Sequence, residues 1–329
     1  MPKLKYPKVC VTGGAGYIGS ICVEQLLEEG HHVTVFDNLS EGHRSAVDER
    51  ATFVRGDLAE RTNLLNAIRA AKAEAIIHFA ASALVGESMT HPSKYFRNNV
   101  ANGLNLLEAA VEAGVKKLVF SSTCATYGPP DSIPITEDLP QRPINPYGES
   151  KLMFERILQW WRQIHGLEFV AFRYFNAAGA TRRFGEHHRV ETHLIPNVLK
   201  VPLGLAAHCE VFGDDYPTSD GTCVRDYIHT IDLAAAHIAA LTPGKAGFFN
   251  LGNGAGYSVR EVIETCEKVC GRSIPVVMKP RRAGDPPTLI ASAEKAAREL
   301  GWKPKLSGLD QIIASAWQWH LEHPTGYPD

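Results

Sequence analysis

The chain has 329 residues, of which 44% are hydrophobic, and a formal net charge of -2. This length is sufficient for a large core and for two domains. The near-balanced charge, with no long run of lysine or arginine, excludes a general binder of the nucleic-acid backbone. No apolar stretch has the length of a membrane span or of a signal peptide, so we expect no membrane partner and a cytoplasmic location.

The first part of the chain alternates short apolar runs with segments of helical periodicity. The pattern predicts strands at 8–12, 32–37, 52–57, 73–80, 116–123 and 167–176, and helices at 17–30, 61–71, 98–114 and 147–166. Because the strands are apolar on both faces, they are typical of a parallel sheet covered by helices. The sequence therefore predicts an α/β fold with a doubly wound parallel Rossmann sheet.

The pattern becomes less regular after about residue 176, where glycine, proline and charged residues are denser. We interpret 177–329 as a second, smaller α/β domain that holds the substrate. Segments near 226–252 are expected to return to the first domain.

Seven cysteines are scattered along the chain, and only Cys266 and Cys270 are close together. Neither belongs to a CxxC pair or a Cys/His ligand set. We therefore expect buried reduced thiols and no metal site.

A glycine-rich turn lies between the first predicted strand and the first helix, in "TGGAGYIG". Gly13, Gly16 and Gly19 allow a tight turn, so that a pyrophosphate can lie against the helix N-terminus. Asp37 ends the second strand, where a carboxylate can accept both ribose hydroxyls and would repel a 2'-phosphate, which favours NAD over NADP. Asp57, at the end of the third strand, is either an adenine-side contact or an ordinary turn residue.

Hydroxyl side chains end the strand at 116–123, at the sheet edge where open α/β folds bind ligands. They are Ser121, Ser122 and Thr123. Tyr147 and Lys151 follow on one face of a helix. Lys151 and a positive nicotinamide ring would favour the tyrosine phenolate, and Thr123 could bond the same substrate oxygen. Such a set can take a hydroxyl proton while hydride leaves for NAD. Taken alone, Thr123 could be a strand-end hydroxyl bonded to backbone and Lys151 a solvated helix lysine. Because they occur together downstream of the glycine turn, we interpret Tyr147 and Lys151 as a catalytic pair.

Together, "TGGAGYIG", "HFAA", "SSTCATYG" and "YGESK" resemble the extended short-chain dehydrogenase/reductases. Further motifs are similar to the UDP-glucose 4-epimerases from end to end: "VGES" (85–88), "RYFNAAGA" (173–180), "VFGDDYPTSDGTCVRDYIH" (211–229), "RRAGDPP" (281–287) and the terminal "HPTGYPD".

The resemblance implies NAD-dependent interconversion of UDP-glucose and UDP-galactose through a 4-keto sugar, with Tyr147 as base, Lys151 beside it and Thr123 in the Ser/Thr position. It implies an NAD-binding domain at 1–176, a mainly UDP-sugar-binding part at 177–329, and a homodimer formed by the helices at 98–114 and 147–166. The sequence equally allows one of these helices to be covered within the monomer. The implied cofactor-binding residues are Gly13, Gly16, Tyr17, Ile18, Gly19, Asp37, Asn38, Asp57, Leu58, Phe79, Ala80, Asn98, Ser121, Tyr147, Lys151 and Tyr174. The implied substrate-binding residues are Thr123, Phe175, Asn176, Leu194, Phe212, Arg225, Tyr227, Arg282, Asp285 and Leu289.

Three positions depart from many members of that family. Ala83 replaces a lysine that contacts NAD, and His193 stands where an asparagine is frequent. Leu289 replaces a bulky tyrosine that narrows the sugar pocket in some members, so we expect activity on UDP-N-acetylglucosamine as well.

Other functions account for fewer of these residues. A nucleotide-sugar 4,6-dehydratase needs an acid and a base after Thr123, where this chain has Cys124 and Ala125. A decarboxylase or uronate epimerase needs a cation for a C6 carboxylate, and none stands out. An NAD-dependent alcohol dehydrogenase leaves the UDP-type motifs unexplained. A non-enzymatic NAD-sensing protein on this fold predicts a degraded Thr–Tyr–Lys set, which is intact here.

Overall fold

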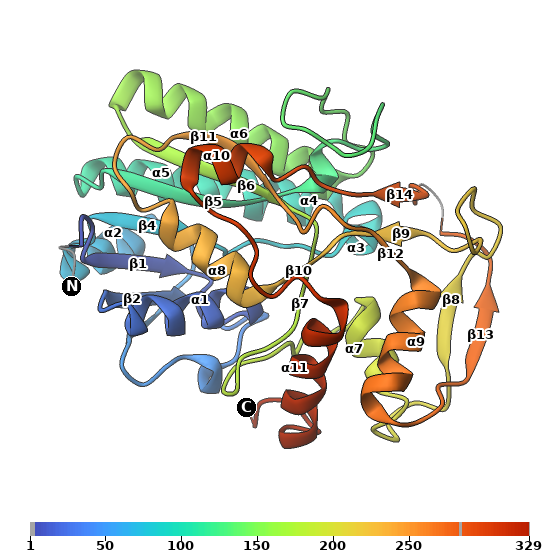
Figure 1. Cartoon of the computed structure of the whole chain (residues 1–329). Coiled ribbons are helices and arrows are strands. Elements are labelled where there is room, and N and C mark those ends of the chain that lie inside the picture. Colours follow the sequence, from blue (N-terminus) through green and yellow to red (C-terminus); the bar gives the residue numbers. More distant parts are fainter. Residues whose placement is uncertain (1–3, 283–284, 329) are drawn as a thin grey trace.

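A parallel seven-stranded sheet forms the centre of the chain in a computed structural model that describes residues 4–282 and 285–328 (Figure 1). In spatial order its strands are β11 (Gly247–Leu251), β6 (Glu168–Tyr174), β5 (Lys117–Thr123), β4 (Ala75–His78), β1 (Lys8–Thr12), β2 (His32–Asp37) and β3 (Thr52–Arg55). The order changes direction between β1 and β4, which creates the crevice where ligands bind in folds of this type. The predicted doubly wound α/β Rossmann sheet is confirmed.

Helices cover both faces of this sheet because its strands are apolar on both sides. Val9 and Val11 of β1 pack into one core with α1 (Tyr17–Glu28) and α8 (Thr230–Ala239). Cys10, between them, points to the other core, which contains residues of α2 (Arg61–Ala71), α5 (Asn102–Glu112) and α6 (Pro146–His165). This alternation follows from the two-residue period of a strand.

The predicted strands and helices of the first part are present, with two differences. The helix expected at 98–114 is a π-helical turn, η2 (Phe96–Ala101), followed by α5. Two short helices precede it, α3 (Val85–Thr90) and α4 (Pro92–Tyr95). The strand expected at 167–176 ends at Tyr174, because the chain leaves the main sheet there. It then forms β7 (Asn176–Ala178), which pairs with β10 (Tyr227–His229) instead.

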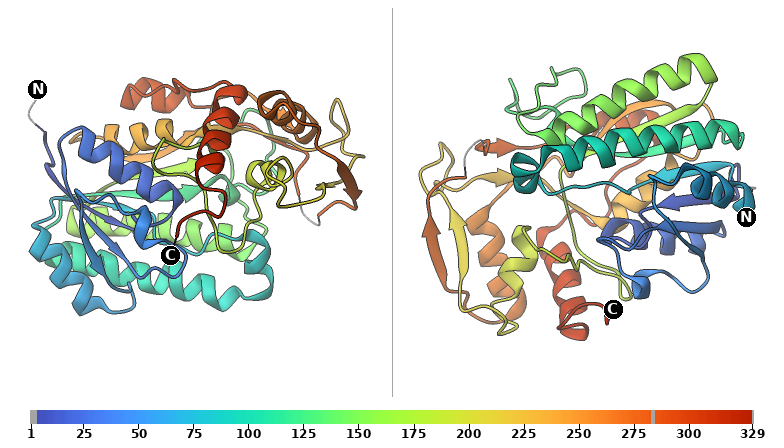
Figure 2. Two further views of the ribbon diagram at one scale, coloured as in Figure 1. Left: turned by 90° about the horizontal axis from the view of Figure 1, so that it is seen from below. Right: turned by 180° about the vertical axis from the view of Figure 1, so that it is seen from behind.

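Small sheets and helices lie beside the carboxyl edge of the main sheet (Figures 1 and 2). A three-stranded sheet has the order β12 (Tyr257–Ser258), β9 (Val224–Arg225), β14 (Thr288–Leu289), and β13 (Val276–Lys279) pairs with β8 (Cys209–Phe212). Residues of α7 (Leu194–Leu199), α9 (Val259–Cys270) and α11 (Leu309–Glu322) share one apolar core here. The last helix before α11 is α10 (Glu294–Leu300).

Part of the chain between residues 226 and 252 runs back to the main sheet. Helix α8 packs against α1, and β11 pairs in parallel with β6 at the sheet edge. The segment therefore links the small sheets to the main one.

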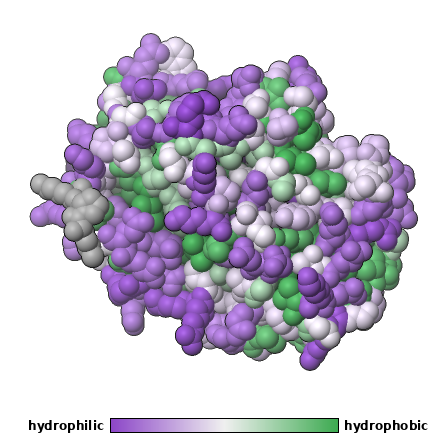
Figure 3. Space-filling model, in the orientation of Figure 1, coloured by the Kyte–Doolittle hydropathy of each residue, from purple (hydrophilic) through white to green (hydrophobic). Residues whose placement is uncertain are grey.

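The face in Figure 3 is mostly polar, with apolar areas that are small and separated. Among the residues that the structure describes, no helix is long and apolar enough to cross a membrane.

Candidate active site

The glycine-rich turn lies in the crevice between the ends of β1 and β4. The N–H groups of Phe79 and Ala80 both donate to the Thr12 carbonyl, at 2.8 and 3.1 Å. A Cβ atom on Gly13 would lie 2.4 Å from the Ala80 nitrogen, and one on Gly19 would lie 2.1 Å from the Gly13 carbonyl oxygen. Only glycine allows this close approach.

The N-terminus of α1 is open to a ligand. Gly16 is its N-cap residue, no side chain caps it, and a Cβ at Gly16 would meet only the Gly13 oxygen, at 3.4 Å. Tyr17 and Ile18 begin the first turn, whose N–H groups have no partner within the helix. These donors and the positive end of the helix dipole suit a pyrophosphate, so the turn fits a dinucleotide.

Asp37 lies beside the turn at the end of β2, as predicted. Its Oδ2 accepts the Ala15 N–H at 3.0 Å and its Oδ1 accepts the Leu39 N–H at 2.8 Å, which leaves lone pairs for ribose hydroxyls. Burial raises the pKa of Asp37, and the two N–H donors lower it. Asn38 donates to Asp57 at 2.7 Å, so these two predicted residues meet as well.

The remaining positions assigned to the cofactor lie near the carboxyl ends of β3, β4, β5 and β6, and Asn98 lies on η2. Leu58 is buried after β3, and the Phe79 ring packs 4.8 Å from that of His237. Asn98 donates to the Ser82 hydroxyl at 3.2 Å, and the hydroxyls of Ser121 and Tyr174 are hydrogen-bonded. Ala83, which replaces the expected lysine, is exposed between β4 and α3.

Tyr147 occupies the first turn of α6 for reasons visible in the local sequence. Asn145 is the N-cap and accepts the Gly148 N–H at 2.8 Å, while Pro146 supplies a helix-compatible φ at the first position. The helix dipole therefore favours a negative charge on the Tyr147 oxygen. Lys151 follows one turn later, its Nζ 5.9 Å from the centre of the Tyr147 ring.

Lys151 is held in place by the strand that carries the hydroxyl residues. Its Nζ donates to the Ser121 carbonyl at 2.8 Å and lies 4.8 Å from the centre of the Phe120 ring. Burial lowers the pKa of Lys151 to about 7, and the charge of Glu155 partly opposes this. Burial raises the pKa of Tyr147 to about 12, while a hydrogen bond from the Thr123 side chain lowers it. Without a ligand, the protein therefore keeps Tyr147 protonated.

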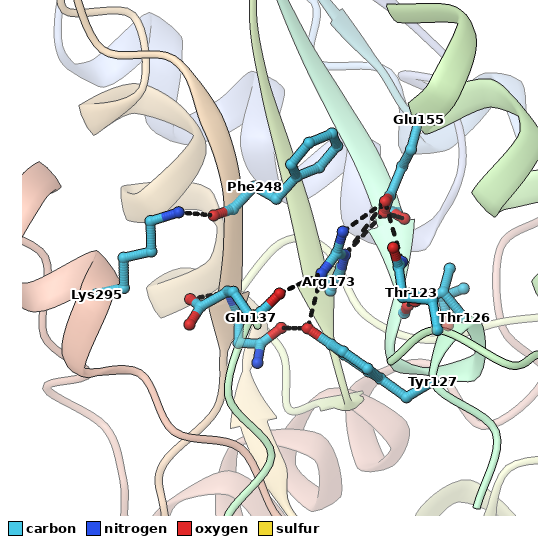
Figure 4. Close-up of polar contacts among 11 residues, drawn as sticks. Thr123, Thr126, Tyr127, Glu137, Glu155, Arg173, Phe248 and Lys295 are labelled. Carbon is cyan, nitrogen blue, oxygen red and sulfur yellow. Dashed lines mark hydrogen bonds and ion pairs between the residues drawn. The ribbon is translucent and has the colours of Figure 1, made fainter. Parts of the chain in front are cut away.

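Thr123 is positioned by bonds within its own turn and by the buried polar network behind it (Figure 4). Its Oγ1 accepts the Ala125 N–H at 3.1 Å, and its carbonyl accepts the Thr126 hydroxyl at 3.0 Å. The adjacent Ser122 donates to Glu155 Oε1 at 2.5 Å. Strand β5 is thereby tied to α6.

Arg173 completes this network from β6. Its Nη2 lies 2.7 Å from Glu155 Oε2, and its Nη1 donates to the Tyr127 hydroxyl at 2.8 Å. Tyr127 donates in turn to Asn250 of β11, whose N–H donates to Glu137 Oε1, each at 2.8 Å. Three strands and a helix are fixed relative to one another around Thr123.

Arg225, Asp285 and Leu289 come together at the three-stranded sheet. The Arg225 Nη2 lies 3.1 Å from Asp285 Oδ1, and Leu289 is the register partner of Arg225 across β14 and β9. Leu289 and Cys124 both pack against the cluster that contains Phe175. Since Cys124 follows Thr123 directly, this cluster joins the Thr–Tyr–Lys set to the residues assigned to the substrate.

Phe212 and Arg282, both assigned to the substrate, also lie together. The Arg282 guanidinium lies over the Phe212 ring, 4.1 Å from its centre. The arginine therefore covers a ring face of Phe212 on which a uracil base could otherwise stack.

Three further residues assigned to the substrate lie outside the main sheet, on β7, β10 and α7. Asn176, the first residue of β7, donates to the Asp226 carbonyl at 3.1 Å. Tyr227 is buried at the start of β10, and Leu194 begins α7.

The sequence analysis named Ser122 but missed the supporting residues Tyr127, Glu155, Arg173 and Asn250. A charged residue on an apolar strand, as Arg173 is in "EFVAFRY", was the available signal, because a buried charge requires a partner. The identity of that partner depends on the tertiary fold.

A glycine turn at the β1/β4 crevice, an acidic residue after β2 and a Thr–Tyr–Lys set at the sheet edge define an NAD-dependent short-chain dehydrogenase/reductase. The model of the NAD dependent epimerase/dehydratase family matches residues 9–252. A UDP-glucose 4-epimerase of Lacticaseibacillus casei is 52% identical over 327 residues, which cover 98% of this chain and 99% of that protein. The chain belongs to the NAD-dependent epimerase/dehydratase family and, within it, to the UDP-glucose 4-epimerases.

Solved structures agree with this assignment. A crystal structure of a UDP-glucose 4-epimerase has a TM-score of 0.95 and 48% identity, over 98% of this chain and 99% of that chain. The UDP-glucose 4-epimerase of Bifidobacterium longum in complex with NAD+ and UDP has a TM-score of 0.93 and 39% identity, over 97% and 99% of the two chains.

Proposed function

We propose that the chain interconverts UDP-glucose and UDP-galactose with Tyr147 as the acid–base residue. The observation that carries the proposal is the meeting of Thr123, Tyr147 and Lys151 at the sheet edge beside the glycine turn, next to the cluster of Phe175 and Leu289. NAD held by the glycine turn and Asp37 would supply a reversible hydride acceptor for C4 of the sugar and a positive charge beside Tyr147.

The protein's own groups move the proton. Tyr147 takes the proton of the 4-hydroxyl and gives it back to the 4-keto sugar, with Thr123 bonded to the same oxygen. The dipole of α6 lowers the free-energy cost of the phenolate, and Lys151 does so in its protonated form. The hydrogen bond from Lys151 to the Ser121 carbonyl fixes the lysine side chain, so its charge stays close to Tyr147, one helical turn away.

Epimerisation also requires firm binding of UDP and loose binding of the sugar. Arg225 and Arg282 are the guanidinium groups available for the pyrophosphate. Arg225 is held by Asp285, and Arg282 must leave the Phe212 ring if uracil is to stack there. The 4-keto sugar can then turn over beside Leu289 while UDP stays bound.

Dehydration is disfavoured by the residue after Thr123. Burial raises the pKa of the Cys124 thiol to about 12, so it stays protonated and cannot take a C5 proton. Ala125 has no ionisable group.

The test is NMR analysis of products after incubation with UDP-galactose and no added NAD. UDP-glucose should form without net NADH, and Tyr147→Phe should abolish its formation. Conversion only after NAD is added would indicate weak retention, in line with Ala83. Absence of conversion with NAD present, or stoichiometric NADH, would contradict the proposal.

We further infer that the chain has two ligand-binding domains. Residues 1–176 bind NAD, and residues 177–329 mainly bind the UDP-sugar. The glycine turn and Asp37 support the first assignment, and Arg225 with Leu289 supports the second. Release of NAD from Asp37→Ala, with UDP affinity unchanged, is the expected result.

A homodimer through α6 is a further proposal. Met153, Trp160 and Ile164 are exposed at helical spacing, and Trp160 and Ile164 are 59% and 67% accessible. Light scattering should give twice the 36.0 kDa chain mass, and Trp160→Lys with Ile164→Lys should give a monomer.

The seven free thiols support a reducing, cytoplasmic location. The expected result of cell fractionation is recovery with cytoplasmic marker enzymes.

A further inference from the structure

A cluster of four metal-binding side chains lies in the loop between β7 and α7. Glu186, His188, Glu191 and His193 each offer one ligand atom, and these atoms all lie within 4.8 Å of one another. The sequence prediction of no metal site depended on the spacing of the cysteines. That spacing carries no information about a set of glutamates and histidines.

The local backbone explains why these four residues meet. They form the pattern Glu-x-His-x-x-Glu-x-His, which is two pairs of alternate residues. Alternate residues of extended chain point to the same side. The chain bends at Arg189 and Val190, between the two pairs, and so brings them face to face.

The four groups converge on one point. Glu186 Oε1 lies 3.2 Å from His188 Nε2 and 3.1 Å from His193 Nδ1. Glu191 Oε1 lies 2.8 Å from the same His193 Nδ1. Nitrogen and oxygen ligands about 2.0–2.2 Å from a tetrahedral zinc ion are roughly 3.4 Å apart. The four atoms here are separated by 2.8 Å at the shortest and by no more than 4.8 Å, so side-chain shifts of up to about 1 Å would admit the ion.

The buried carboxylates of the site also require positive charge around them. Each glutamate has only 7% of its side chain exposed. In the described part of the chain, the ion pairs of Glu186 and Glu191 are with histidines alone. Arg189, the arginine between the two pairs, donates instead to the carbonyls of Leu39, Ser40 and Gly42. Without an ion, protonated His193 pairs with both glutamates. A bound ion would displace that proton, and two carboxylates with two neutral imidazoles would then neutralise one divalent ion.

The structure assigns to this loop a binding site for one first-row divalent metal ion, preferentially zinc, with Glu186, His188, Glu191 and His193 as ligands. Imidazole and carboxylate without thiolate suit zinc, cobalt and related ions. The side chain of His193 is 47% exposed, which leaves a path for the ion.

The loop that carries the site lies between Tyr17 of α1 and helix α7. At its start the loop is held by Tyr17, whose hydroxyl donates to the Gly179 carbonyl at 2.5 Å. The ring of His188 meets that of Tyr17 edge-on, 6.0 Å between centres. At its end the loop passes into α7 at Leu194. An ion would therefore stiffen the segment between β7 and α7, which contacts α1 through the rings of His188 and Tyr17.

The test uses the full chain stripped with a chelator, dialysed against zinc and then against metal-free buffer, with metal measured by mass spectrometry. We expect about one zinc per wild-type chain, and less than one tenth of that in His188→Gln and Glu191→Gln. His208→Gln is the matched control, because His208 is exposed and outside the cluster, and it should keep one zinc. Circular dichroism would establish that the variants are folded.

Cobalt loading gives a second readout that does not depend on a variant. Cobalt held by the cluster in tetrahedral geometry should give an intense visible absorption band, absent from His188→Gln. Failure of the wild type to retain either ion would overturn the proposal and leave a Glu–His ion-pair cluster. Equal metal content in wild type and both ligand variants would overturn it too, because the ion would lie elsewhere.

Discussion

Arg173 and Glu155 form a buried ion pair behind Thr123, with Nη2 and Oε2 2.7 Å apart and both side chains at most 3% exposed. The pair joins β6 to α6, and through Ser122 it also holds β5. It is thus the point at which the strand carrying Thr123 and the helix carrying Tyr147 and Lys151 are fixed to each other.

Glu155→Gln should lower the free energy of unfolding by about 3–5 kcal/mol, because it leaves the Arg173 charge buried without a counter-charge. Urea denaturation measures the change. Asp131→Asn is the matched control, since its pair with Arg142 is 54% and 66% exposed, and it should change stability by less than about 0.5 kcal/mol. A loss below about 1 kcal/mol in Glu155→Gln would show that water or another group compensates Arg173.

The contrast between Tyr147 and Arg173 shows how far the sequence can predict this site. Tyr147, Lys151 and the glycine turn are recognisable because their spacing is local, within one helix or one turn. Arg173 and Glu155 are 18 residues apart and meet only once β6 lies beside β5 and α6. Long-range pairing of this kind leaves no periodic signal in the sequence.

The same distinction holds in the second part of the chain. Motifs were sufficient to assign Phe212 and Arg282 to the substrate. Their stacking could not be predicted, because it depends on the pairing of β8 with β13, which brings the ends of these two strands together. The π-helical turn at Phe96–Ala101 likewise left no mark on the periodicity used to predict a helix at 98–114.

Tyr147→Phe should lower kcat by about 100- to 10,000-fold, because the variant lacks the oxygen that carries the proton. The ring and its edge contact with Tyr95, 6.3 Å between centres, are retained, so NAD content per chain should stay unchanged. Steady-state kinetics and extraction of bound nucleotide measure the two effects. Tyr6→Phe, at a half-buried position near the N-terminus, is the control and should keep wild-type kcat. Unchanged turnover in Tyr147→Phe would remove Tyr147 from the mechanism.

Stability should fall steeply in mild acid because of buried neutral histidines. Burial lowers the pKa of His78 to about 3 and those of His229 and His237 to about 4. An unfolded chain takes up protons on these residues near pH 6.5, whereas the folded chain does not. Above pH 6.5 these histidines therefore cost no stability. As the pH falls from 6.5 towards 4, the free energy of unfolding decreases by up to about 1.4 kcal/mol per pH unit for each histidine.

His237→Phe isolates one of these contributions. The His237 ring lies between those of Phe79 and Phe172, with centres 4.8 and 4.9 Å away, so phenylalanine keeps the packing and removes the titration. Between pH 6 and 4.5 the slope of unfolding free energy against pH should decrease by about 1.4 kcal/mol per unit. His208→Gln, at an exposed position, should leave the slope unchanged. Identical slopes in His237→Phe and wild type would mean that His237 is protonated in the folded protein.

Leu289→Tyr should make the enzyme discriminate against 2-acetamido sugars. Leu289 is half-buried on β14, beside Arg225 and in the same cluster as Cys124. A tyrosine there would take up space that the acetamido group needs. We expect kcat/KM for UDP-N-acetylglucosamine to fall about 10- to 200-fold relative to that for UDP-glucose, the range for small steric differences in a pocket. Leu205→Tyr, at a position 58% exposed, is the control for the added ring and should change neither value. Equal losses on both substrates would place Leu289 outside the acetamido pocket and assign it a general role in packing the site.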